Sequence, residues 1–142
     1  MASQESPSFA ASLTLLVDRG ADATQVAAAV VGTFGEIDAA LAPIVGPRGV
    51  AALYMRSMFL ATTAHPWLAG AQGGNPTELD VTPLQSVLAR QGSAEAATGG
   101  GAVLQTFHDL LASLVGSSLT ERLLRSVWTH LSSDPSVQDP SP

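Results

Sequence analysis

The sequence predicts an all-α fold, a bundle of five to six helices built from two helix-turn-helix hairpins. Three observations lead to this fold class. Apolar residues recur at helical spacing along nearly the whole chain, glycine and proline divide this pattern into segments, and two stretches resemble each other. With 142 residues, the chain is long enough for one hydrophobic core. We expect one helical domain over residues 1–132, followed by a disordered tail over 133–142 that is rich in Pro, Ser and Asp.

The first two predicted helices are separated by Gly20, which is typical of the residue after a helix end. The second helix begins at Asp22, and Gln25 occupies the position of a capping box. Its apolar residues are spaced close to a heptad repeat: Val26, Val30, Phe34, Ile37, Leu41 and Ile44. We expect Pro43 and Gly46 to end or kink this helix.

The third predicted helix begins at Pro47 and ends near His65. Its main apolar face holds Val50, Leu53, Tyr54, Met58 and Ala61. Met55 and Phe59 lie outside that face, so the helix has apolar residues on more than one side. Residues 69–77 have the composition of a loop.

A short fourth helix is predicted after Asp80 or Thr82, with Gly92 closing it. The next segment, residues 93–101, ends in three consecutive glycines. Because glycine is the least favourable residue in a helix after proline, we expect this segment to be a flexible linker or a frayed turn.

The fifth and sixth predicted helices repeat the pattern of the second and third. Residues 111–116, Leu-Ala-Ser-Leu-Val-Gly, match residues 41–46, Leu-Ala-Pro-Ile-Val-Gly, at an offset of 70. The sixth helix follows Gly116 with a capping box at Ser118 and Glu121. One hairpin cannot bury its apolar face alone, so two similar hairpins are expected to face each other. The pattern leaves open whether they arose by duplication.

Composition excludes several classes of protein. The chain has no cysteine, which removes disulfides, zinc-thiolate sites, iron-sulfur clusters and thiol catalysis. Its six basic residues are scattered arginines and its net charge is -6, so we expect no nucleic-acid partner. The N-terminus lacks the pattern of a secretory signal, and the apolar stretches are interrupted, so we expect no membrane span and a cytoplasmic location. The absence of lysine beside abundant Ala, Gly and Arg suggests a bacterial source.

The sequence offers little catalytic chemistry. Of the three histidines, His65 lies at a helix exit, His108 at the edge of an apolar stripe, and His130 near the end of the last helix. The chain contains no Glu-x-x-His pair, an arrangement typical of metal sites in helical bundles. We therefore expect no metal or other cofactor. A phosphotransfer role for His108 is a third hypothesis, although the Lys and Gly that follow such a histidine are missing. We expect the protein not to be an enzyme.

One group of large side chains stands out as a candidate site: Tyr54, Met55, Met58, Phe59 and Trp67. They are interpreted either as core or as an interface or pocket. Apolar residues make up 46% of the chain and charged residues 13%, more apolar surface than a small bundle can hide. The leading hypothesis is therefore an interaction or regulatory module that forms a homodimer through apolar helix faces. The alternative is a small apolar ligand bound near Tyr54, Met58 and Trp67.

Overall fold

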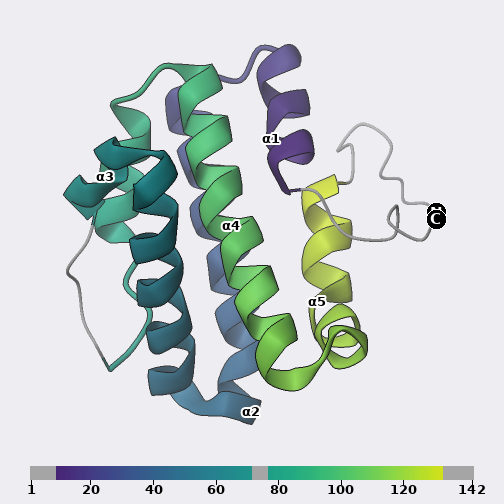
Figure 1. Ribbon diagram of the computed structural model, residues 1–142. Coiled ribbons are helices and arrows are strands. Elements are labelled where there is room, and N and C mark those ends of the chain that lie inside the picture. The colour runs from purple at the N-terminus through teal and green to yellow at the C-terminus, as the bar shows by residue number, and fades with distance from the viewer. Residues whose placement is uncertain (1–8, 72–76, 133–142) are drawn as a thin grey trace, which may run out of the picture.

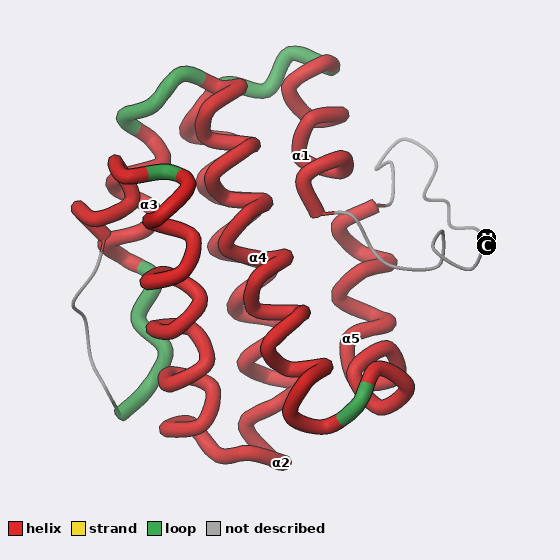
Figure 2. The backbone as a smooth tube through the Cα atoms, viewed as in Figure 1, coloured by secondary structure: helices red, strands yellow, loops and turns green. Residues whose placement is uncertain are grey.

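The computed structural model describes residues 9–71 and 77–132, and 88% of these residues are helical, with no strand among them. The predicted all-α bundle is confirmed (Figures 1 and 2). Its helices are α1 (Phe9–Asp18), α2 (Ala23–Ala64), the short 3-10 helix η2 (Pro66–Ala71), α3 (Thr82–Ala89), α4 (Ser93–Val115) and α5 (Ser117–Ser132). The predicted tail lies outside the described residues. Part of the predicted loop at 69–77 is instead the end of η2.

The start of α2 forms the predicted capping box. The backbone N–H of Gln25 donates to the Asp22 carboxylate at 2.9 Å, and the backbone N–H of Asp22 donates to the Gln25 side chain at 2.9 Å. Two backbone donors that the first turn leaves unpaired are thereby satisfied.

Helix α2 folds back on itself at Gly46, as the sequence predicts, whereas Pro43 lies inside the helix. Gly46 has φ 82° and ψ 158°, a conformation that residues with a Cβ rarely adopt. Phe34 and Tyr54 are twenty residues apart, about 30 Å along a straight helix, yet their ring centroids lie 5.2 Å apart. We call residues 23–45 the first arm and residues 47–64 the second arm. Together they form the first hairpin.

Helices α4 and α5 form the second hairpin, with its turn at Gly116. The backbone of Gly116, with φ 95° and ψ 149°, resembles that of Gly46. Both turns lie at the same end of the molecule (Figure 1). Matched positions also have matched burial: Leu41 and Leu111 are fully buried, whereas Ile44 and Leu114 are 53% and 64% exposed. The internal similarity therefore extends from sequence to backbone and packing.

The prediction of a linker over residues 93–101 is wrong, because this segment forms the first turns of α4. A Cβ on Gly99 would lie 2.4 Å from a ring carbon of Trp67, and a Cβ on Gly100 would lie 2.6 Å from a methyl of Val30. The glycines thus permit close packing. Gly92 is the N-cap of α4, while α3 already ends at Ala89.

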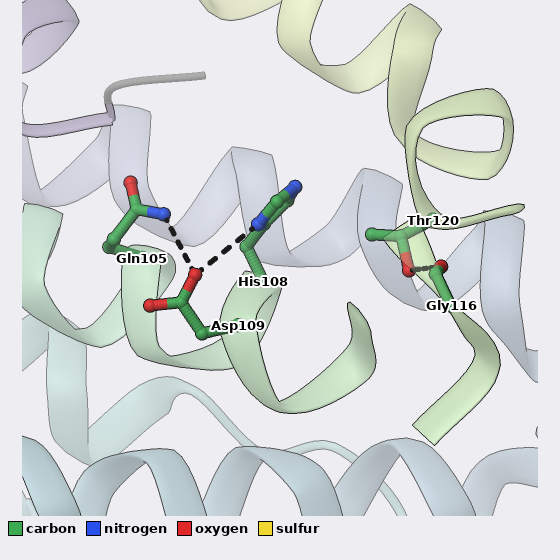
Figure 3. A network of polar contacts seen from close by, with 5 residues as sticks. All are labelled: Gln105, His108, Asp109, Gly116 and Thr120. Carbon is green, nitrogen blue, oxygen red and sulfur yellow. Dashed lines mark hydrogen bonds and ion pairs between the residues drawn. The ribbon is translucent and has the colours of Figure 1, made fainter. Parts of the chain in front are cut away.

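The start of α5 also differs from prediction. The helix begins at Ser117, so Ser118 lies inside its first turn. The hydroxyl of Thr120 donates instead to the carbonyl of Gly116 at 2.8 Å (Figure 3). This bond ties the first turn of α5 to the turn between the two helices.

The core draws buried side chains from all the helices, and the first arm of α2 meets α4 within it. Phe34 and Phe107 meet there with ring centroids 5.7 Å apart in a T-shaped arrangement, which aromatic pairs favour. Helix α1 packs mainly on α4, and α3 packs mainly on α2. By length and composition α2 also passes the test for a membrane span, with an 18-residue window of mean hydropathy 1.5. Core helices of soluble proteins pass the same test.

Candidate functional site

The five large side chains singled out in the sequence do not form one cluster. Tyr54 and Met58 are 5% and 2% exposed and belong to the core, whereas Met55 and Phe59 are 40% and 62% exposed. Trp67 is half-buried, and its ring covers Gly99 of α4. The second arm of α2 therefore presents two apolar faces, one to the core and one to solvent.

Tyr54 carries an unsatisfied polar group within the core. Its ring meets Phe34 edge to face, but its hydroxyl has no hydrogen-bond partner among the described residues. Burial raises the pKa of Tyr54 well above its ordinary value, and the nearby negative charge of Asp80 adds to this effect. Tyr54 therefore remains neutral, with the packing role of a phenylalanine.

An open groove lies between the second arm of α2 and the C-terminal part of α4. Its volume is about 470 Å3, and its walls are almost entirely apolar. The residues that line it are Gly49, Ala52, Leu53, Arg56, Leu110, Ser113 and Leu114. Arg56 is the one charged side chain in these walls, and it is exposed.

Exposed hydrophobic side chains extend the groove along the second arm. Gly49, Ala52, Arg56 and Phe59 follow at spacings of three and four residues, so they share one side of the helix. Met55 lies beside Phe59 on the same outer side. We call the residues lining the groove, together with Met55 and Phe59, the groove face. The sequence indicated two residues of the groove face, Met55 and Phe59, because they lie outside the main apolar stripe of their helix.

Leu114 is the large, exposed hydrophobic residue of the groove that sequence reasoning did not place in the candidate site. It belongs to the broad apolar stripe of α4, yet it is 64% exposed and lines the groove. Its counterpart in the first hairpin, Ile44, is 53% exposed. The matched sequences at residues 41–46 and 111–116 were the available signal, because both put a large apolar residue two positions before the turn glycine.

His65 lies at the helix exit that the sequence predicts. It is the C-cap of α2, and its backbone N–H donates to the carbonyl of Ala61 at 3.0 Å. Its ring centroid lies 6.1 Å from that of Trp67. The two rings line a shallow pocket of about 280 Å3 with Glu95 and neighbouring residues of α4.

His108 lies deeper than the edge position that the sequence suggests. It is 8% exposed, and its ring centroid lies 6.2 Å from that of Phe9 on α1. Its Nδ1 is 3.6 Å from a carboxylate oxygen of Asp109, too far for a hydrogen bond, and neither ring nitrogen has another partner among the described residues (Figure 3). The Asp109 carboxylate accepts a hydrogen bond from Gln105 at 3.2 Å. A ring buried in this way is poorly placed to accept a phosphoryl group.

The remaining candidate chemistry is sparse. Within residues 9–71 and 77–132, no group of three or more His, Asp or Glu side chains could hold a metal ion. The side chain of His130 lies outside the described part of the structure. The groove face is therefore the feature with the clearest potential for binding.

Comparison with known proteins adds no analogy. No protein family model matches the chain, and neither a curated protein nor a solved structure matches it.

Proposed function

We propose that this protein is a helical interaction module that acts as a homodimer, with the groove face of one copy against that of the other. The observation that carries the proposal is the open apolar groove between the second arm of α2 and α4. Phe59 and Leu114, two of the most exposed large hydrophobic residues, belong to this face. An apolar surface of this kind favours a protein partner over water.

The exposed apolar area is large enough to form the centre of a dimer interface. Large apolar side chains expose roughly 150–250 Å2 when fully solvated, so Met55, Phe59 and Leu114 leave roughly 300 Å2 in water at their exposed fractions. A stable interface buries about 800 Å2 per partner. The groove walls and the polar side chains at its edge would supply the remainder.

The shape of the face favours a second copy as the partner. A two-fold dimer needs a self-complementary surface, with a protrusion and a recess on each copy. Phe59 protrudes from the second arm, and Ala52, two turns earlier, lies in the recess. Antiparallel pairing of two second arms would place each Phe59 over the partner's Ala52. Arg56 could keep its guanidinium in water while its aliphatic stem covers the groove wall.

Charge reversal on the groove face tests the proposal. We expect the wild-type protein to have twice the monomer mass of 14.5 kDa at micromolar concentration in light scattering. Phe59→Glu and Leu114→Glu should each give monomers with unchanged helical content, because a carboxylate would be buried without a partner in the dimer. Leu15→Glu is the matched control, since Leu15 is 54% exposed on α1. A monomeric wild type, or a dimer that survives both groove substitutions, would contradict the proposal.

The apolar-ligand alternative gains no specific support. Tyr54 and Met58 are packed in the core, and Trp67 lies against Gly99, away from the groove.

We also propose a bacterial, cytoplasmic location for the dimer, on the basis of composition. The lack of cysteine suits a reducing compartment, and the polar residues Glu36 and Asp38 interrupt the apolar stretch of the first arm. Fractionation without detergent tests the location, with the protein expected in the supernatant. Recovery in the membrane fraction alone would contradict it and would favour α2 as a membrane segment.

A further inference from the structure

Helix α1 covers a buried histidine at the edge of the bundle. This ten-residue helix packs mainly on α4, and its contacts with α2 and α5 are few. Phe9 and Leu13 are 1% and 0% exposed, so they attach α1 to the core. The ring of Phe9 lies over His108 at a centroid distance of 6.2 Å. Figure 1 shows α1 beside α4, on the opposite side of α4 from the second arm of α2.

The histidine beneath α1 is left without hydrogen bonds. A neutral imidazole has one donor and one acceptor, and both nitrogens of His108 are buried with no partner among the described residues. Asp109 does not supply the missing partner. Its carboxylate oxygen lies 3.6 Å from Nδ1 of His108, and the carboxylate is largely in solvent and accepts a hydrogen bond from Gln105. Burying polar atoms without hydrogen-bond partners costs free energy, and the cost disappears when water can bond to them. The closed position of α1 therefore carries a local cost that opening would remove.

The connection between α1 and α2 is a short, hydrogen-bonded turn. Helix α1 ends in a turn at Gly20, whose φ is 102°, and the backbone N–H of Ala21 donates to the carbonyl of Leu16 at 3.0 Å. Few residues separate this turn from Asp22, where the capping box fixes the start of α2. A helix of ten residues is too short to persist alone in water, so contacts with α4 hold it in place.

We propose that α1 is a strap that opens from α4 while the rest of the bundle stays folded, and that the unsatisfied imidazole of His108 sets how often it opens. In the closed state Phe9 covers the imidazole. In the open state water reaches both ring nitrogens, and the apolar surface of α4 under Phe9 and Leu13 becomes accessible. This opening is separate from the groove face, so it does not depend on the proposed dimer.

Hydrogen exchange of the full-length protein tests the strap. Amides of α1 should exchange by a local opening, faster than those in the middle of α4. His108→Leu should slow exchange in α1 by about fivefold to tenfold, because leucine fills the site without needing hydrogen bonds. Asp109→Asn is the control: it removes the neighbouring charge but leaves the ring nitrogens unsatisfied, so exchange in α1 should stay as in wild type. Equal exchange of α1 and α4, or no slowing with His108→Leu, would overturn the proposal.

A chemical probe of the wild type gives an independent test. Diethyl pyrocarbonate acylates an imidazole nitrogen only when that nitrogen is accessible. Under native conditions His108 should react measurably but more slowly than the half-buried His65, and far faster than global unfolding allows. Reaction of His108 only at the rate of global unfolding would also overturn the proposal.

Discussion

Two regions of the molecule use the same kinds of residue in opposite circumstances. One is the interior contact between the two hairpins, and the other is the groove face. Inside, Phe34 packs on Phe107, and Gly99 and Gly100 admit Trp67 and Val30. Outside, Phe59 of the groove face is 62% exposed. On the first arm, away from that face, a Cβ added to Gly32 or Gly35 would meet nothing within 4 Å. Apolar and small residues alone therefore do not identify a core. The apolar side chains that lack packing neighbours within the monomer are the ones available to bind a partner.

The largest expected contrast is between two phenylalanines of α2. Phe34→Ala should lower the free energy of unfolding by about 3–5 kcal/mol, because it leaves a cavity at the junction of the hairpins. Phe59→Ala should change it by less than about 0.5 kcal/mol when measured at a concentration where the protein is monomeric. Urea denaturation followed by circular dichroism measures both. Similar losses at the two sites would show that Phe59 already has a partner within the monomer.

A pair of glycine substitutions makes a finer comparison. In an open position of a helix, Gly→Ala adds about 1 kcal/mol of stability, so Gly32→Ala should be stabilising by this amount. Gly100→Ala has the same helix-propensity gain, but its Cβ would lie 2.6 Å from Val30, and overpacking costs about 1–3 kcal/mol. The two variants should therefore differ by about 1–3 kcal/mol in thermal or urea unfolding. Equal effects would show that Gly100 is not closely packed against Val30.

The smallest expected effect concerns the hydroxyl of Tyr54. Because this buried hydroxyl has no hydrogen-bond partner, Tyr54→Phe should raise the free energy of unfolding by about 1 kcal/mol at neutral pH. Destabilisation would instead reveal a hydrogen bond to the hydroxyl.

The same residue predicts a loss of stability in alkali. The pKa of Tyr54 is raised in the folded state above its ordinary value of 10.0, chiefly because burial disfavours the phenolate. Below that ordinary value the phenol is neutral in both states, so its effect on stability is constant. As the pH rises above it, the unfolded chain loses its proton first and stability falls. Tyr54→Phe should show a smaller fall in urea denaturation over this range.

Much of the fold was accessible from the sequence because its signals are local. The near-heptad apolar spacing of the first arm, the capping box at Asp22, and the turns at Gly46 and Gly116 all depend on residues close together in the chain. Gly99 and Gly100 were misread because their helical packing depends on Trp67 and Val30, which are distant in sequence.

The candidate site was only partly predictable for the same reason. Met55 and Phe59 fell outside the apolar stripe of their own helix, which indicated an outer surface. Leu114 fell inside its stripe, and its exposure depends on how α4 and α5 pack around it. The burial of His108 depends on α1, another element that helical periodicity along α4 cannot position.

The proposed dimer is tested most directly by sedimentation equilibrium of the unmodified chain over a range of micromolar concentrations. We predict a monomer–dimer equilibrium that approaches twice the 14.5 kDa monomer mass at the upper end of the range. A single species of monomer mass throughout would contradict the proposal that the groove face binds a second copy.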